Sequence, residues 1–290
     1  MEAGLRTVRH IVRLRSARLS AMPPSKEPPL RVLLQLPELK SPIDDATRVG
    51  RPTGWSVLTR LQAIRETREV VLDAFKTAMQ NPNLAMRALG TVGAALNESR
   101  KINLRFDHAP RGTPWEALDP LCRASLAWDG LADRGRTWLD DRTLFLCPLL
   151  GVVTASERIP DYRCPPGAKL PEIGSVHKFW KDAVSSTRNR LTKHETVVSF
   201  LPKRMNALWD ADDTPRDVRV VRFARRDRGT MNGETAAVPR LTGEALNWMA
   251  GAGAPTMDRL REFTSSLGHR HDPSLESEES GFPLMVFVRG

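Results

Sequence analysis

The hydrophobic residues after the first 30 positions fall into short, almost uninterrupted runs. Runs of about four to eight apolar residues are typical of strands that are buried on both faces of a sheet. The first of them, Arg31-Val-Leu-Leu-Gln-Leu36, opens the globular part of the chain. The predicted strands cover residues 31–36, 144–147, 152–154, 196–201, 218–223 and 281–288.

Stretches with a helical period lie between these runs. The longest covers residues 55–96 and is interrupted at Asn81-Pro82, because proline does not fit the interior of a helix. Helices and strands are mixed without a repeat or an obvious linker. We therefore expect a single domain of the mixed α/β (α+β) class over residues 31–290, with a mixed β-sheet flanked by helices. The further predicted helices cover residues 176–191, 241–249 and 255–267.

Charge adds a second pattern to this picture. The 290 residues carry 44 basic and 34 acidic side chains, a net charge of +10. Residues 1–26 hold six of the basic residues and one acid, so half of the net charge lies in this short segment. We expect residues 1–30 to form a basic, flexible N-terminal tail. The alternatives are a targeting peptide and sequence upstream of a true start at Met22.

Several classes of protein are excluded by what the sequence lacks. No apolar run approaches the roughly 18–20 residues that span a bilayer, and we expect a cytoplasmic protein. The cysteines Cys122, Cys147 and Cys164 lie far apart, which predicts reduced thiols rather than a disulfide framework. No phosphate-binding glycine loop, dinucleotide fingerprint or serine-nucleophile elbow occurs. We predict neither a cofactor nor a metal site, and we interpret His269 and His271 as part of a solvated loop.

Two glycines, Gly90 and Gly93, lie in the segment Leu89–Leu96. The segment is similar to the turn of a helix-hairpin-helix DNA module, in which closely spaced glycines let backbone N–H groups reach a phosphate. Here the glycines are three apart rather than two, and no Lys or Arg stands beside them. The pattern therefore favours an ordinary helix end.

The only tyrosine, Tyr162, precedes Arg163 in a proline-rich loop over residues 160–171. Together these side chains can present a hydroxyl group and a planar cation to an anionic or planar ligand. The alternative is that Tyr162 packs and Arg163 forms an ion pair at the surface.

A group of arginines follows the predicted strand 218–223. Four guanidinium groups within seven residues, at the end of a buried strand, favour a phosphate or carboxylate site, although charge runs are usually solvated surfaces. Lys203 and Arg204 form a smaller set of the same kind after the strand 196–201. The larger group consists of Arg222, Arg225, Arg226 and Arg228.

At these residues the sequence resembles the YaaA family, the peroxide stress proteins of bacteria. Short segments that follow one another in order, from residue 31 to residue 289, carry the resemblance. Their common order and near-constant spacing make it more specific than any one motif. The segments are Val32–Lys40, Trp128–Leu131, Leu149–Gly151, Ile159–Arg163, Leu170–Trp180, Val197–Pro202 and Arg225–Met231.

The resemblance implies a single-domain mixed α/β fold and a role in hydrogen peroxide stress. It also implies binding of double-stranded DNA through a basic cleft and a contribution to limiting iron-driven damage. Nothing in the sequence encodes an iron site, so an effect on iron would be indirect. The residues expected to contact DNA or another anion are Lys40, Arg163, Lys203, Arg204, Arg225, Arg226 and Arg228.

The sequence also departs from the family at polar positions. The family has a tyrosine at the position of Leu150 and an aspartate or asparagine at the position of Ser199. It has a serine at the position of Pro202. These changes are consistent with a specialised paralogue that has changed its ligand.

The alternative function is therefore an enzyme of specialised metabolism that uses the same cleft on a small anionic or nucleotide-like substrate. Glu38 would be the acid or base, and Lys40 and Tyr162 would donate protons or stabilise charge. A third alternative is a degenerate member with a purely structural or partner-binding role. The sequence carries no signal for an oligomeric state.

Overall fold

The computed structural model describes eight stretches of the chain. The predicted basic tail and the start of the first predicted helix lie outside them. The described residues are 29–36, 64–109, 111–192, 195–206, 218–227, 230–252, 255–279 and 281–290.

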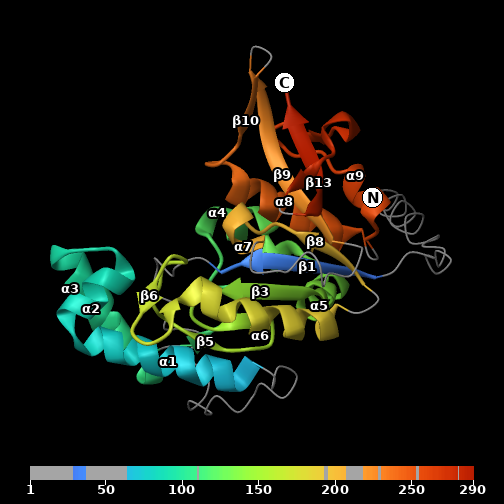
Figure 1. Ribbon diagram of the computed structural model, residues 1–290. Helices are drawn as coiled ribbons and strands as arrows, with labels where there is room; N and C mark the ends of the chain where they lie inside the picture. The colour runs from blue at the N-terminus through green and yellow to red at the C-terminus, as the bar shows by residue number, and fades with distance from the viewer. Residues whose placement is uncertain are drawn as a thin grey trace, which may run out of the picture.

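In the described part of the chain, one sheet of nine strands forms the centre of the molecule (Figure 1). Five strands are parallel, in the spatial order β3-β1-β8-β9-β13. The expected mixed α/β class is thus confirmed, and five of the six predicted apolar runs are these parallel strands. They are β1 (Leu30–Gln35), β3 (Thr143–Cys147), β8 (Thr196–Ser199), β9 (Val218–Asp227) and β13 (Phe282–Arg289).

Short antiparallel strands complete the sheet. One edge carries β4, which pairs with β3, and the other carries β11, which pairs with β13. β10 pairs with β9, and β12 pairs with β13. The bounds are β4 (Gly151–Thr154), β10 (Thr230–Gly233), β11 (Arg270–His271) and β12 (Glu278–Glu279). Two small ribbons lie apart from this sheet, β2 (Arg111–Gly112) with β5 (Ile159–Pro160) and β6 (Lys169–Leu170) with β7 (Gly174–Ser175).

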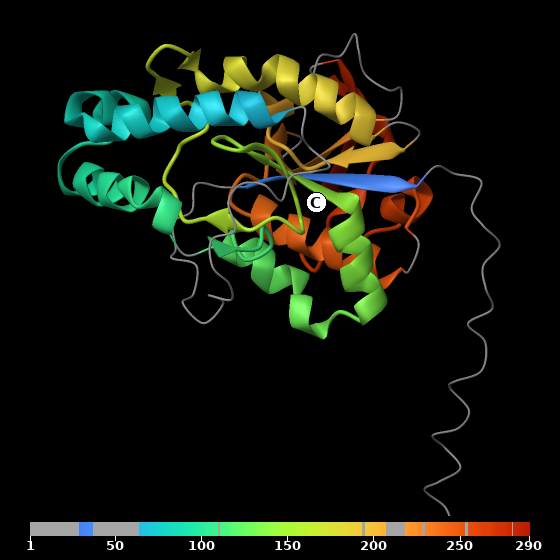
Figure 2. The same cartoon turned by 90° about the horizontal axis from the view of Figure 1, so that it is seen from below.

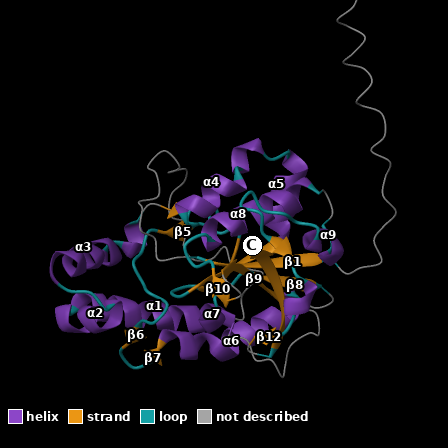
Figure 3. Cartoon of the chain, turned by 90° about the horizontal axis from the view of Figure 1, so that it is seen from above, coloured by secondary structure: helices purple, strands orange, loops and turns teal. Residues whose placement is uncertain are grey.

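Helices cover both faces of the sheet, and this explains why its central strands are apolar throughout. α1 (Arg65–Gln80) and α6 (Val176–Leu191) lie on one face, and α5 (Asp133–Arg142) and α8 (Val238–Gly251) lie on the other (Figures 2 and 3). All five residues of β3 and all four of β8 are buried. The other helices are α2 (Pro82–Leu89), α3 (Gly93–Leu104), α4 (Pro120–Leu126), α7 (Lys203–Asn206) and α9 (Met257–Arg261).

The predicted break at Asn81-Pro82 is confirmed. Asn81 ends α1 and caps α2, because its side-chain oxygen accepts the N–H groups of Asn83 and Leu84 at 2.9 and 3.3 Å. Pro82 occupies the first turn of α2, where no intrahelical N–H is needed. Gly90 ends α2 in the left-handed region, with φ of 63°. The ordinary helix end expected for this glycine segment is therefore what the structure contains.

Two elements differ most from the sequence prediction in their extent. β9 continues to Asp227, four residues beyond the apolar run, because β10 folds back and pairs with it. The helix predicted over residues 255–267 is confined to Met257–Arg261. It stops early because Ser265 and His269 close a turn through the Ser265 N–H and the His269 carbonyl.

Glycines let the helices on one face approach closely. A Cβ atom added to Gly243 of α8 would lie 2.2 Å from the carbonyl oxygen of Cys122 in α4. One added to Gly135 of α5 would lie 3.0 Å from the carbonyl oxygen of Ala250. Backbone atoms cannot move aside as a flexible side chain can, so α4 can pack on α8 at this distance only if residue 243 has no side chain.

Gly243→Ala should therefore lower the free energy of unfolding by about 1–3 kcal/mol, through overpacking against α4. Urea denaturation monitored by circular dichroism measures this. Gly251→Ala, in the same helix, is the matched control because a Cβ there meets nothing within 4 Å. The control should be neutral or slightly stabilising. Equal destabilisation by both substitutions would contradict the proposed steric cause.

Candidate functional site at the carboxyl ends of the strands

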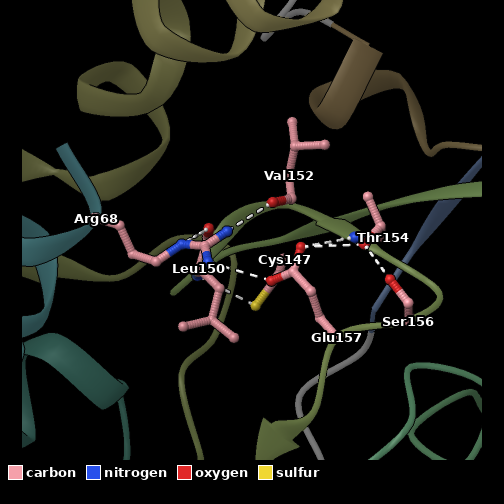
Figure 4. Close-up of polar contacts among 7 residues, drawn as sticks. All are labelled: Arg68, Cys147, Leu150, Val152, Thr154, Ser156 and Glu157. Atoms are coloured by element: carbon pink, nitrogen blue, oxygen red, sulfur yellow. Dashed lines mark hydrogen bonds and ion pairs between the residues drawn. The ribbon is translucent and has the colours of Figure 1, made fainter. Parts of the chain in front are cut away.

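A buried arginine holds the turn between β3 and β4 (Figure 4). Arg68 of α1 donates from Nε to the carbonyl oxygen of Leu150 at 2.8 Å and from Nη2 to that of Val152 at 2.7 Å. Its Nη1 lies 3.2 Å from Oε2 of Glu157. The two side chains are only 3% and 9% exposed. One guanidinium group thus joins α1, the turn and the segment after β4.

Desolvation shapes the protonation of this pair. Burial lowers the pKa of Arg68, and the Glu157 carboxylate opposes that effect. Burial likewise raises the pKa of Glu157, while Arg68 and the backbone N–H of Thr154 favour its charged form. Thr154 N lies 2.9 Å from Glu157 Oε1. Each charge is therefore tolerated in the core because the other is present.

Arg68 was not found by sequence reasoning, although a signal existed. It occupies the buried face of α1 together with Val71, Leu72 and Phe75, at helical spacing. An arginine at such a position predicts an internal ion pair. Nothing local in the sequence singled out Glu157.

The turn that Arg68 holds carries a buried thiol. Cys147 Sγ lies 2.9 Å from Tyr162 Oη and accepts the Leu150 N–H at 3.2 Å. Tyr162 and Cys147 are 0% and 2% exposed, and desolvation raises the pKa of Cys147. This is the arrangement described by the packing alternative for Tyr162, and its hydroxyl has no direct path to solvent.

Packing explains why the Leu149–Gly151 motif ends in a glycine. Its φ is +72°, and a Cβ there would lie 2.7 Å from the ring of Trp180. Trp180 in turn donates from Nε1 to the Pro148 carbonyl at 3.0 Å. The conformation of the turn therefore requires a glycine beneath the indole.

A small pocket opens beside this turn, between the end of β3, α6 and α7. His177 contributes an imidazole to its otherwise apolar lining. Desolvation, and then the positive charge of Arg204, lower the pKa of His177. His177 is a site residue that sequence reasoning missed, and only its position one turn before Trp180 hinted at it. The lining residues are Leu146, Cys147, Pro148, Gly151, Pro166, His177, Trp180, Val184 and Met205.

Lys203 and Arg204 begin α7, directly after β8, and both are exposed. Among the described residues, no carboxylate lies within ion-pair distance of either. Met205, the next residue, lines the pocket. The predicted basic pair after this strand is thus beside the pocket.

Arg163 differs from this pair. Its Nη1 lies 2.5 Å from Oδ1 of Asp161, and its side chain is 12% exposed. The backbone N–H of Arg163 donates a hydrogen bond to Oδ1 of Asn103 at 2.7 Å, and its carbonyl oxygen accepts one from Nδ2 of Asn103 at 2.8 Å. Arg163 therefore holds its loop onto α3 and has a carboxylate partner already.

Three members of the predicted arginine group, Arg222, Arg225 and Arg226, lie within β9 rather than after it, and this corrects the sequence interpretation. Arg225 and Arg226 stand opposite Asn232 and Met231 of β10. Because consecutive residues of a strand point to opposite faces, these two side chains cannot line one wall of a cleft together. Arg222 is half-buried and pairs with Glu279.

The β9–β10 hairpin extends beyond β8 (Figure 1), whereas β13 pairs with the other edge of β9 as far as Arg225. β8 ends at Ser199, which pairs with Val220, whereas β9 continues to Asp227. Arg225 pairs with Asp227 at 3.6 Å and Arg226 with Asp272 at 3.2 Å, and both arginine side chains remain about half exposed, at 48% and 51%. Such exposed pairs are weak and exchange readily for other anions.

The interpretation of His269 and His271 as a solvated loop was wrong. His269 is 0% exposed and packs edge-on against Phe223, and the side chain of His271, in β11, is 8% exposed. Pairing of β11 with β13 places the His271 ring beside Phe287. No group of three potential metal ligands occurs in the described stretches.

Ser265, His269 and Glu234 have the composition of a catalytic triad but not its function. Ser265 Oγ lies 3.0 Å from His269 Nδ1, yet it also accepts the His269 backbone N–H at 3.0 Å and is 5% exposed. Glu234 is engaged by Arg289 at 2.6 Å. The group stabilises a turn.

Three of the predicted site residues lie outside the described residues. They are Glu38 and Lys40, which come after β1 in the sequence, and Arg228, which comes after β9 in the sequence.

Comparison with known proteins agrees with the resemblance seen in the sequence. The model of the family described as peroxide stress protein YaaA matches residues 124–275, slightly more than half of the chain. The chain belongs to this family. The match includes Tyr162, Arg163, Lys203 and Arg204, as well as the β9–β10 hairpin, and it ends before the buried β13.

Individual relatives are distant. A UPF0246 protein of Rickettsia bellii is 24% identical over 162 residues, which cover 55% of this chain and 63% of the relative. A UPF0246 protein of Limosilactobacillus fermentum is 27% identical over 188 residues, which cover 63% of this chain and 73% of the relative. The chain thus spans a little under two thirds of the length of the Rickettsia protein. In the stretches that the structure describes, no helix is both long and apolar enough to cross a bilayer.

Arg68→Met should lower the free energy of unfolding by about 3–5 kcal/mol, because it leaves Glu157 charged and unpaired in the core. Arg68→Met combined with Glu157→Leu should recover part of this loss, since the isolated charge is then absent. Arg65→Ala, on the exposed side of α1, is the control and should change stability by less than about 0.5 kcal/mol. Urea denaturation measures all three. A double variant no more stable than Arg68→Met would contradict the charge argument.

The three cysteines should be inert in the folded protein. All are buried, and burial raises the pKa of Cys122 to about 12, so thiolate is scarce. We expect slow reaction with a thiol reagent before unfolding and three reactive thiols in urea. Prior treatment with hydrogen peroxide should leave that count unchanged. Selective loss of Cys147 in folded protein would contradict this expectation.

Proposed function

We propose that this chain is a cytoplasmic protein of the hydrogen peroxide response that binds double-stranded DNA, and so helps to limit iron-driven damage. The observation that carries the proposal is the end of the β9–β10 hairpin, with Arg225 and Arg226 half exposed on opposite faces of β9. Exposed arginines of this kind can bind the backbone phosphates of a duplex. Phosphates can replace Asp227 and Asp272 as partners because exposed ion pairs are worth little.

The DNA-contacting set is smaller in this proposal than in the sequence interpretation. Arg163 has a buried carboxylate partner, so we assign it no phosphate. Lys40 and Arg228 remain predicted contacts. The effect on iron is indirect, because binding would shield DNA from radicals rather than hold the metal.

Replacing both Arg225 and Arg226 by Ala should weaken duplex binding and lower the slope of log affinity against log salt by about two, since each phosphate contact releases roughly one counterion. Fluorescence anisotropy of a labelled duplex, between about 50 and 200 mM salt, measures both quantities. Arg87→Ala with Arg134→Ala is the charge-matched control, because both arginines are exposed on other elements. The proposal fails if the unmodified chain binds no duplex at low salt, or if the two double variants behave alike.

A second candidate function is an enzyme acting on a small anionic substrate. Strand order favours it: β1 lies between β3 and β8, so the chain reverses its direction across the sheet at β1. In open sheets of parallel strands, ligands bind outside the carboxyl ends at such a reversal. The hydroxyl group of Tyr162 is buried against the thiol of Cys147 and cannot reach a substrate. Glu38 and Lys40 therefore remain as the candidates for an acid, a base or a group that stabilises charge.

A further inference from the structure

An acidic segment near the carboxyl end of the chain lies beside the basic strand β9. Residues 272–279 contain four carboxylates and no lysine or arginine. The segment includes a single 3-10 turn, Pro273–Leu275, and ends in β12. It follows the edge of β13 on which β11 pairs, whereas β9 pairs with the other edge. Only the width of β13 therefore separates the acidic segment from β9.

Side chains at both ends of this segment reach across to arginines of β9. Oδ2 of Asp272 lies 3.2 Å from Nη2 of Arg226. At the other end, Glu279 accepts a hydrogen bond from Nε of Arg222 at 3.0 Å and a second one from Nη2 of the same guanidinium group. Arg222 and Arg226 are four residues apart in one strand, so both project from the same face of it. The segment thus places two carboxylates on one basic face of β9.

Little apolar packing holds the acidic segment in this position. None of residues 272–279 is buried. Two backbone hydrogen bonds, apart from the short pairing of β12, join the segment to β13. Asp272 N–H donates to the Val286 carbonyl at 2.9 Å, and Leu284 N–H donates to the Ser277 carbonyl at 2.8 Å. Segments with few buried contacts open at a lower free energy than the core does, so the contact with β9 is reversible.

The carboxylates of this segment and the phosphates of a nucleic acid need the same partners. A guanidinium group binds a carboxylate or a phosphate through the same fork of N–H donors. Arg222, whose side chain is 24% exposed, directs its fork at Glu279. A phosphate can therefore bind Arg222 only after Glu279 has left it, and the same competition holds at Arg226 with Asp272.

We propose that residues 272–279 form an autoinhibitory segment that competes with the phosphate backbone of DNA for Arg222 and Arg226. The inference rests on the proposed duplex binding, and it assigns to that function both a regulation and a further contact, Arg222. In the closed state the segment occupies both guanidinium groups. Its release frees the basic face of β9, so the unmodified chain binds a duplex less tightly than its arginines allow.

The double variant Asp272→Asn with Glu279→Gln tests the proposal in the full-length chain. Both substitutions remove a charge and keep an oxygen acceptor, which Ser274 N–H requires at residue 272. Fluorescence anisotropy of a labelled duplex measures affinity between about 50 and 200 mM salt. We expect the affinity to rise by about three- to tenfold, the range for losing two competing ion pairs of modest strength. The slope of log affinity against log salt should steepen by about one to two, because more phosphates are contacted.

The double variant Glu276→Gln with Glu278→Gln is the matched control, because it removes the same charge from the same segment. Glu276 pairs with His271, and within the described residues neither carboxylate contacts an arginine of β9. We expect a change in affinity of less than about twofold. Circular dichroism of each variant establishes that it is folded.

A triple variant tests the assignment of Arg222. Adding Arg222→Gln to Asp272→Asn with Glu279→Gln should remove most of the gain in affinity, because the phosphate contact that the first two substitutions made available is lost. An unchanged affinity in the triple variant would show that Arg222 does not bind the duplex.

Hydrogen–deuterium exchange gives a second readout that does not depend on any variant. Binding of a duplex usually slows exchange at the surface that it covers. In residues 272–279 of the unmodified chain we expect faster exchange when the duplex binds, because the DNA displaces the segment from β9.

The inference is overturned if the two double variants raise the affinity equally, if neither raises it, or if exchange in residues 272–279 slows when the duplex binds. In each of these cases the unmodified chain still binds a duplex, so the proposed function stands. If neither the unmodified chain nor any variant binds a duplex at low salt, the proposed function fails and the inference fails with it.

Discussion

The architecture around the sheet depends on a single buried guanidinium group. Arg68 comes from a helix on one face, and its partners are two carbonyls of the β3–β4 turn and a carboxylate beyond β4. An unpaired charge in such a place would be prohibitive. The helix, the turn and the following segment must therefore assemble together. The same turn positions Cys147 and Gly151, which form part of the pocket wall, so the ion pair indirectly sets the shape of the candidate site.

The positive charge of the chain acts locally rather than as a continuous field. Most arginines of the described site region already face a carboxylate, on β9 as well as in the loop of Arg163. What distinguishes them is exposure. Pairs at the hairpin are solvated and can exchange partners, whereas the pair of Arg163 is enclosed and structural. Lys203 and Arg204 form a third kind, exposed and beside a pocket. The net charge of the chain does not distinguish exposed ion pairs, an enclosed ion pair and exposed cations beside a pocket.

Sequence patterns predicted the central strands and the helices α1, α6 and α8, but they predicted no element between residues 97 and 142, where α4 and α5 lie. Apolar runs located the parallel strands because both faces of the sheet are covered, and Asn81-Pro82 marked a true helix boundary. The extension of β9 was missed because its last residues are polar and are held by pairing with β10, a contact that an apolar pattern does not record. His269 was placed in solvent because its neighbours are charged, yet tertiary packing against Phe223 buries it. His177 and Glu157 acquire significance only from partners distant in sequence.

The position of β1 has a consequence for how the molecule assembles. It is the first strand in the described part of the chain, yet its two neighbours are β3 and β8, whose pairing residues begin at Thr143 and Thr196. Until those segments leave the ribosome, both hydrogen-bonding edges of a strongly apolar strand lack partners. Parallel pairing across such long separations is slow, and exposed strand edges invite aggregation. The nascent chain should therefore rely on chaperones until β8 has emerged and enclosed β1.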